Sequence, residues 1–247
     1  PADAWEHMKT DGADLRFTTD RAGVNQINHN PLRLDPATQT ARIDVAVPSL
    51  MSSDETTIWA WVGNPDAEAP SEAERQAVYS DDWLMVLPFE EGGGVDVYDQ
   101  TMYENHGTVE NTGGDPNWIE GADGWYVTLD PGSGQHIRCP HLSEISYVND
   151  YSFIAYAKSD YIGTNRRTLI GNSNGGSDRN VMGMDDGEMG MGYYDGGNWH
   201  GRAGNITAGW HHWVGTNAAG SLQFFEDGIE KTSWFSPYMS GDNTWLY

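Results

Sequence analysis

Hydrophobic and polar residues alternate with a period of two along much of the chain. Ile43, Val45 and Val47 alternate with Asp44 and Ala46. Such alternation predicts β-strands that bury one face. Gly, Asn, Asp and Pro clusters separate the runs, and short strands between such turn signals are typical of an all-β sandwich or jelly roll. The other predicted strands cover residues 58–62, 83–89, 125–129, 151–158, 210–214 and 222–225.

One polar and acidic stretch, residues 68–82, breaks this pattern. Within it, Ser71 and Glu74 have the spacing of a capping box, in which each residue caps the other's backbone. The stretch therefore predicts a linker helix at about residues 72–79 and a domain boundary near residue 80. We expect a small β-domain over residues 1–80 and a larger one over residues 81–247. We expect both ends to be cut from a longer protein.

Two β-hairpins are marked by Asp-Gly turns, a strong hairpin signal. In the first, Met and Gly alternate over residues 182–184 and 188–192, on either side of Asp186-Gly187. This alternation predicts one methionine face, which fills the core, and one bare glycine face on which a ligand chain can lie flat. The second hairpin covers residues 222–230, with its turn at Asp227-Gly228.

The amino-acid composition excludes several classes of protein and of site. The 247 residues include 37 acidic and 13 basic side chains, a net charge of −24, which argues against nucleic-acid binding because phosphates need clustered Lys and Arg. The 11 Trp and 12 Tyr are too many for a disordered acidic tail. No run approaches the roughly 18 apolar residues of a membrane span. Cys139 is the single cysteine, so the chain has no internal disulfide and no cysteine-based zinc site.

Four segments, in order, resemble the laminin-G-like, concanavalin A-like jelly roll, and together they cover about two-thirds of the chain. DQTMYENHGT at 99–108 is similar to the family's D-x-S-G-N-x-N-x-G-T loop. GWYVTLD at 124–130, followed by QHI, resembles its A-L-x-F-D-G … Y-V strand pair. YSFIAYAK at 151–158 resembles F-T-I-S-A-W-V-K. GWHHWV at 209–214, followed by LQFFEDG, resembles W-H-H-V-A … L-Y-V-D-G.

The first 80 residues resemble the C-terminal part of a small β-domain of unknown function that often precedes such jelly rolls. DGADLRFT at 11–18 is similar to its G-A-D-I-R-F-T signature, and VAVPSL at 45–50 and WVGNP at 61–65 resemble two of its strands. The resemblance implies an all-β protein, a jelly-roll sandwich with a smaller, N-terminally truncated β-domain. It also implies a secreted, cell-surface or virion context without catalysis.

The residues of the chain also give no indication of a catalytic site. Glycoside hydrolases of jelly-roll shape carry an E-x-D-x-x-E strand whose carboxylates share one face, and the sequence has no such strand. The acidic segment 226–230 spans a turn, so we expect its carboxylates to point apart. His211 and His212 are adjacent on a predicted strand and therefore face opposite sides. We expect Trp210, His212 and Val214 on one face and His211 with Trp213 on the other, with one of the two sets packed in the core.

The loop at 99–108 resembles one that often holds a structural ion in the laminin-G-like family. Asp99, Asn105 and the carbonyls between them offer the oxygen ligands that calcium prefers, and Asp96, Asp115 and Asp130 can add carboxylates nearby. The sequence therefore predicts a calcium site at Asp99 and Asn105. The alternative is an Asx-turn loop whose side chains bond to the backbone.

Carbohydrate binding is predicted from aromatic and polar residues that follow the Met/Gly strand. Sugars present apolar CH faces and hydroxyls, so their sites pair Trp or Tyr with amide, carboxylate or guanidinium groups. The alternative is that these aromatics cover the edge of the sandwich. The predicted ligand-binding residues are Tyr193, Tyr194, Asp195, Asn198, Trp199 and Arg202.

Together these features predict a non-enzymatic binding or adhesion module of a cell-surface, secreted or virion protein that recognises carbohydrate. One alternative is a structural spacer or decoration module of a phage or viral particle or a surface layer, in contact with neighbouring protein subunits. Another is an accessory carbohydrate-binding region of a polysaccharide-degrading enzyme. The sequence leaves these three open.

Overall fold

The chain forms two compact units, Pro1–Asp130 and Pro131–Tyr247, each described here by itself. The computed structural model describes residues 2–110, 116–122, 124–130, 134–159, 167–173, 179–185, 188–195, 198–205 and 208–234. Strand accounts for 46% of the chain and helix for 5%, which confirms the predicted all-β class. Among the described residues, no helix has the length and apolar character to cross a membrane.

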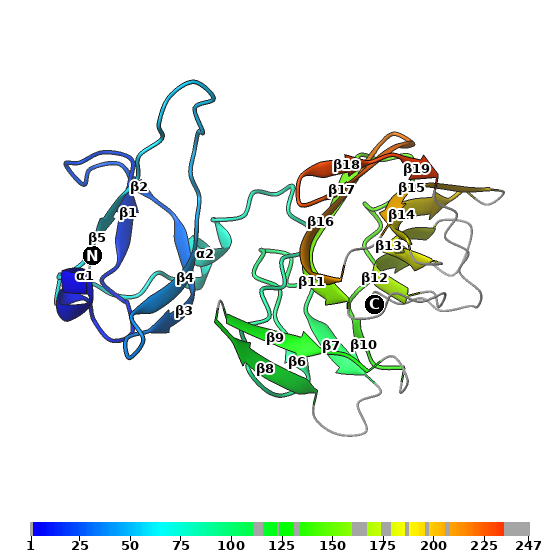
Figure 1. The fold of residues 1–247 in the computed structure, drawn as a ribbon. Coiled ribbons are helices and arrows are strands. Elements are labelled where there is room, and N and C mark those ends of the chain that lie inside the picture. Colours follow the sequence, from blue (N-terminus) through cyan, green and yellow to red (C-terminus); the bar gives the residue numbers. More distant parts are fainter. Residues whose placement is uncertain are drawn as a thin grey trace. The chain divides into compact units, whose positions relative to one another are not determined.

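Unit 1 begins with short antiparallel elements. A three-stranded sheet has the order β2-β1-β5, and a separate hairpin pairs β3 with β4 (Figure 1). The small core at this end includes Ala13 and Leu15, both about 5% exposed. The element bounds are α1 Ala2–His7, β1 Arg16–Thr18, β2 Gln26–Ile27, β3 His29–Asp35, β4 Thr40–Val45 and β5 Trp59–Trp61.

The predicted helix is present as α2, Glu72–Gln76, and its capping box is confirmed. The Ser71 hydroxyl accepts from the Glu74 backbone N–H at 3.3 Å, and the Glu74 carboxylate accepts from the Ser71 N–H at 2.7 Å. The helix is shorter than predicted. After Gln76 the backbone bonds span three residues instead of four, with Tyr79 N–H donating to Gln76 O, so the chain turns away as a tighter bend.

The rest of unit 1 consists of two strand pairs. β6, Asp96–Val97, pairs with β7, Gly107–Glu110, and β8, Asn117–Gly121, pairs with β9, Gly124–Thr128. The predicted strand at 83–89 is wrong. Val86 N–H donates to the Asp99 side chain instead of to a neighbouring strand, and Phe89 has a φ of 60°, so this segment is irregular.

Long-range ion pairs join residues before and after position 80 within unit 1. Arg42 on β4 pairs with Glu90 at 2.8 Å, and Arg33 on β3 pairs with Glu120 on β8. The predicted boundary near residue 80 therefore falls inside unit 1. The division into domains 1–80 and 81–247 stays a prediction.

Unit 2 contains two antiparallel sheets (Figure 1). The four-stranded sheet has the order β11-β16-β17-β18 and the five-stranded sheet has the order β12-β13-β14-β15-β19. A further short strand is β10, His136–Arg138. The bounds in the first sheet are β11 Tyr151–Ser159, β16 Gly209–Ala218, β17 Ser221–Glu226 and β18 Ile229–Lys231. Those in the second sheet are β12 Arg167–Ser173, β13 Arg179–Asp185, β14 Glu188–Tyr194, β15 Trp199–Asn205 and β19 Ser233–Trp234.

The two sheets of unit 2 pack against each other in a sandwich-like arrangement. Gly215 on β16 lies directly against Met191 on β14, where a Cβ at position 215 would overlap the methionine sulfur. At Gly204 on β15, a Cβ would overlap the aliphatic stem of Lys231 on β18. The side chains that fill the interior are apolar and at most 5% exposed: Phe153, Met182, Met189, Met191, Trp213 and Phe224.

Both predicted hairpins are present. β17 and β18 join through Asp227 and Gly228, with φ values of 51° and 79°, as a two-residue turn with left-handed residues requires. β13 and β14 pair with Met182 opposite Met191 and Met184 opposite Met189, while Asp186 and Gly187 lie outside the described residues. The methionine face fills the core as predicted. The glycine face is not open, because Gly183, Gly190 and Gly192 are also buried.

Candidate functional site

The predicted carbohydrate site begins at a buried residue. Tyr193 is 6% exposed, and its ring stacks between Tyr147 and His200, with centroids 5.5 and 4.8 Å away. Its hydroxyl donates to the Gly220 carbonyl at 3.3 Å. Burial in this position raises the pKa of the Tyr193 hydroxyl. These contacts leave no ring face for a sugar and favour the alternative in which Tyr193 covers the sandwich edge.

Polar side chains of this predicted site form hydrogen bonds within the loop that carries them. The Asp195 carboxylate accepts from the Asn198 backbone N–H at 2.8 Å and lies 3.0 Å from the His200 Nε2. Asn198 and Arg202 are exposed and Tyr194 is half-buried. The backbone of Trp199 starts β15, but its side chain lies outside the described part of the structure. The site at 193–202 therefore stays a prediction.

The predicted calcium ligand Asp99 is 4% exposed and is fully engaged with protein donors. Its Oδ1 accepts from the N–H groups of Val86 and Thr101, at 2.8 and 3.1 Å. Its Oδ2 accepts from the Thr101 hydroxyl at 2.7 Å and the Asn105 N–H at 2.8 Å. A carboxylate has about four acceptor sites, so these four donors fill them.

The other residues of this loop also bond locally. The Asn105 side chain donates to the Leu84 carbonyl at 2.8 Å, and the His106 Nδ1 accepts from the Asp99 N–H at 3.0 Å. Asp96 is exposed, and Asp115 lies outside the described residues. The geometry favours the Asx-turn alternative, and the calcium site stays a prediction.

An exposed aromatic pair lies elsewhere, on the outer face of the four-stranded sheet. Tyr156 on β11 is 65% exposed and Trp210 on β16 is 38% exposed. Their rings stack with centroids 5.2 Å apart and 22° between the planes. Lys158 is the register partner of Trp210, and His212 is that of Tyr156, so both lie beside the pair. We call Tyr156 and Trp210 the aromatic platform.

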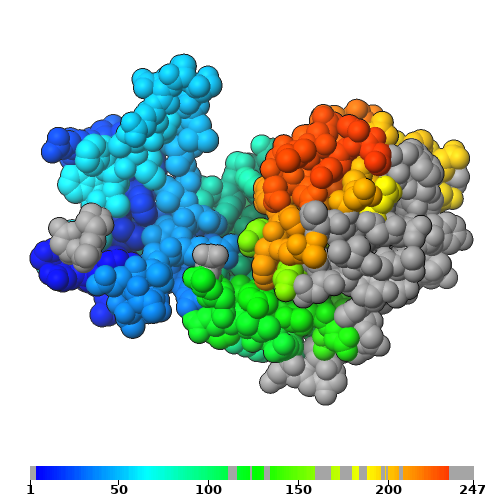
Figure 2. Space-filling view, in the orientation of Figure 1, coloured from blue at the N-terminus to red at the C-terminus, as the bar shows by residue number. Residues whose placement is uncertain are grey.

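The sheet faces around the platform follow the predicted alternation. Trp210 and His212 face outward, and Trp213, 3% exposed, faces the core, so the structure decides which of the two predicted faces is buried. Strands β17 and β18 of this sheet, orange-red in Figure 2, form part of the surface of unit 2. Tyr156 was not among the predicted ligand-binding residues. The signal for it is the unbroken apolar run at 153–157, which places apolar side chains on both faces of β11.

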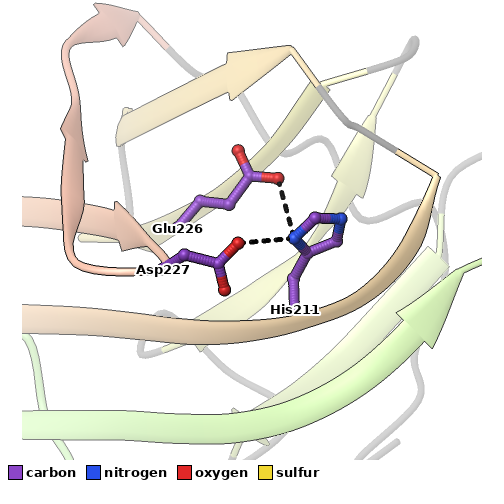
Figure 3. A group of neighbouring side chains, drawn as sticks. All are labelled: His211, Glu226 and Asp227. Carbon is purple, nitrogen blue, oxygen red and sulfur yellow. Dashed lines mark hydrogen bonds and ion pairs between the residues drawn. The ribbon is translucent and has the colours of Figure 1, made fainter.

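On the inner side of the same sheet, His211, Glu226 and Asp227 converge (Figure 3). The His211 Nδ1 lies 2.8 Å from an Asp227 oxygen and 3.5 Å from a Glu226 oxygen. The expectation that the carboxylates of segment 226–230 point apart was wrong for Glu226 and Asp227, whereas Glu230 lies opposite Phe225 on the other face of the sheet. Asp227 adopts a left-handed backbone conformation in the turn, and this conformation directs its side chain back towards β16.

Electrostatic interactions link the members of this group, although the buried His211 Nε2 has no hydrogen-bond partner among the described residues. The hydrogen bond to Asp227, assisted by the Glu226 charge, raises the pKa of His211 against the opposing effect of burial. The same bond and the His212 backbone N–H lower the pKa of Asp227. Lys231 pairs with the other Glu226 oxygen at 2.7 Å. With His211 protonated, two positive groups balance two carboxylates.

This group also contains the donor types of a transition-metal site. One nitrogen and two carboxylate oxygens lie within 4.8 Å of one another, and such a set suits zinc or manganese. An ion would have to displace the His211 proton and compete with the Lys231 ammonium for Glu226. The charge balance therefore favours a structural role, in which His211 fixes the β17–β18 turn to β16.

One protein family matches part of the chain. No curated protein and no solved structure matches the chain. The matching segment begins at the DGADLRFT motif and extends past the predicted boundary near residue 80, into the second half of unit 1. The expected resemblance to a small β-domain of unknown function is thereby confirmed: residues 11–115 match the family described as Domain of unknown function (DUF2341).

Proposed function

We propose that this chain is a non-enzymatic binding module that recognises carbohydrate through the aromatic platform of unit 2. The observation that carries the proposal is the stacked pair of Tyr156 and Trp210, exposed on the outer face of a β-sheet. Large aromatic side chains usually bury their area in cores or interfaces. Two such side chains that stack on each other while exposed to solvent indicate a surface that a ligand covers.

The chemistry of the platform suits a sugar. The CH face of a pyranose packs on an aromatic ring, while its hydroxyls need donors and acceptors at the side. His212 and Lys158 lie next to the rings and are exposed, so they are placed to supply such groups. Shallow contact of this kind gives modest affinity, and repeated modules along one ligand raise it.

The proposed architecture agrees with this role. We propose that residues 81–247 form a laminin-G-like, concanavalin A-like jelly roll, supported by the two antiparallel sheets that pack through Gly215 and Met191. Fold alone does not fix function, so the platform carries the argument. We further propose a secreted, cell-surface or virion setting, where glycans are exposed.

The test is a glycan screen of the purified chain, followed by titration calorimetry with Trp210→Ala and Tyr156→Ala. We expect saturable binding to a glycan class, weakened at least about tenfold by either change, or about 1.4 kcal/mol. Trp83→Ala is the matched control, since Trp83 is 45% exposed in unit 1. Unchanged melting temperatures would exclude misfolding as the cause.

Two results would overturn the proposal. One is binding that survives loss of both platform rings. The other is a failure to bind any glycan. If the chain then also associates in a concentration-dependent way in sedimentation experiments, the structural spacer is favoured, because the same exposed face would serve protein–protein contact.

A further inference from the structure

We infer that the ligand of the aromatic platform is an uncharged glycan chain that crosses the strands of the four-stranded sheet. This inference rests on the proposed function and adds the ligand class and its direction. It follows from the side chains that share the outer face with Tyr156 and Trp210, which the strand register places in rows.

An apolar row runs across the sheet beside the platform. Ile154 on β11 pairs with Val214 on β16, and Val214 pairs with Phe225 on β17. Ile154 is 45% exposed, and Val214 and Phe225 are half-buried. Neighbouring strands are about 4.8 Å apart, so the row continues the apolar surface of Tyr156 over about 10 Å. This direction is perpendicular to the strands.

A row of uncharged hydrogen-bonding groups borders the apolar row. Ser152 on β11 pairs with Thr216 on β16, and Thr216 pairs with Gln223 on β17. Ser152 and Gln223 are exposed, and Thr216 is half-buried. Hydroxyl and amide groups beside an apolar strip match the two surfaces of a sugar, its hydroxyl edge and its CH face.

The charges on this face of the sheet and on the whole chain disfavour the binding of acidic glycans. Sulfated or uronic sugars require clustered Lys or Arg, as other polyanions do. Among the described side chains of these rows and the platform row, Lys158 is the one permanent cation and Glu230, opposite Phe225, is the one carboxylate. The chain carries a net charge of −24, which repels polyanions at low salt.

The ligand class is tested with the intact chain against neutral polysaccharides and their sulfated or uronic counterparts, at about 0.05 and 0.5 M NaCl. We expect the neutral polymers to bind more tightly at both salt concentrations. Their affinity should change by less than about twofold between the two, since screening acts on charge. Salt-sensitive binding of acidic polymers that is lost in Trp210→Ala would overturn this inference while leaving the proposed function standing.

The direction is tested with Gln223→Ala. A chain that crosses the strands contacts β17, so we expect this change to weaken binding of long neutral chains about two- to tenfold, the loss of one hydrogen bond. A chain that follows β11 and β16 does not reach Gln223, and unchanged affinity would overturn the proposed direction. Ser221→Ala, on the same strand at the end of the sheet, is the control. Absence of all glycan binding would instead overturn the proposed function itself.

Discussion

Asp227 closes the β17–β18 turn onto β16 through three hydrogen bonds to two adjacent residues. Its carboxylate accepts from the His211 Nδ1 at 2.8 Å and from the His212 backbone N–H at 2.9 Å. Its own N–H donates to the His212 carbonyl at 2.9 Å. A single turn residue thus fixes a hairpin to the neighbouring strand, and its side chain carries two of the three contacts.

We therefore expect Asp227→Ala to lower the melting temperature more than Asp227→Asn does. Asparagine tolerates the left-handed conformation at this position and keeps an oxygen acceptor, whereas alanine loses both side-chain contacts. Thermal unfolding followed by circular dichroism measures the difference. Glu230→Gln on the same hairpin is the control, and equal destabilisation by all three changes would contradict this account of the turn.

Asp99 organises the loop between β6 and β7. Because its buried carboxylate accepts four hydrogen bonds, we expect Asp99→Ala to reduce the free energy of unfolding by about 2–4 kcal/mol, measured by urea titration.

The same four bonds predict that calcium or a chelator leaves the melting temperature of the wild-type chain unchanged. A rise with calcium that disappears in Asp99→Asn would reverse this expectation and support the calcium site.

His29 predicts a pH dependence of stability. Burial, together with the Arg16 charge, lowers the pKa of His29, and the Glu74 carboxylate on α2 opposes this effect. The folded state therefore resists protonation more than the unfolded state does, whose pKa is about 6.5. Below about pH 6.5 the unfolded state binds the proton more readily than the folded state does. The free energy of unfolding therefore decreases as the pH is lowered.

Urea unfolding at about pH 5 and pH 7.5 checks this expectation for His29. In His29→Asn the difference between the two pH values should be smaller than in the wild type. His7→Asn changes an exposed histidine and serves as the control. An identical pH difference in wild type and His29→Asn would contradict the role of His29.

Glu91 predicts a change that stabilises the protein. Burial raises its pKa, and one of its oxygens is buried without a hydrogen-bond partner among the described residues, while the other accepts from the Tyr98 N–H at 2.9 Å. Because the folded pKa lies above the unfolded value, the ionised group costs stability as pH rises through the folded pKa.

We expect Glu91→Gln to raise the melting temperature at about pH 7.5 and to have little effect at about pH 4, where the carboxyl is largely protonated. Glu55→Gln, a change at an exposed carboxylate of unit 1, controls for net charge. A variant that is less stable at both pH values would show that the amide fits the site poorly.

Local patterns predicted local structure well. The capping box at Ser71 and Glu74 and the turn at Asp227-Gly228 are set by neighbours in the chain, and both are confirmed. Alternation also predicted that Trp210 and Trp213 lie on opposite faces of their strand, which their exposures of 38% and 3% confirm. These features depend on backbone geometry over a few residues, which the sequence encodes directly.

Features that depend on distant pairing were missed. The contact of Tyr156 with Trp210 needs the β11–β16 register, which joins residues more than fifty positions apart. The Arg42–Glu90 ion pair joins β4 to the segment after residue 80, a contact that no local pattern predicts. Tyr193 is of a residue type that is common in sugar-binding sites, but its ring stacks on Tyr147 and on His200.

Lys231 connects two sheets in different ways along its length. Its aliphatic stem lies on Gly204 of the five-stranded sheet, and its ammonium pairs with Glu226 of the four-stranded sheet. Separating the layers would strip the stem of its packing and would expose to solvent the ion pair between Lys231 and the buried Glu226, which lie on neighbouring strands of the four-stranded sheet. Both sheets should therefore unfold as one cooperative unit, with amide hydrogens of β15 and β17 exchanging at similar rates.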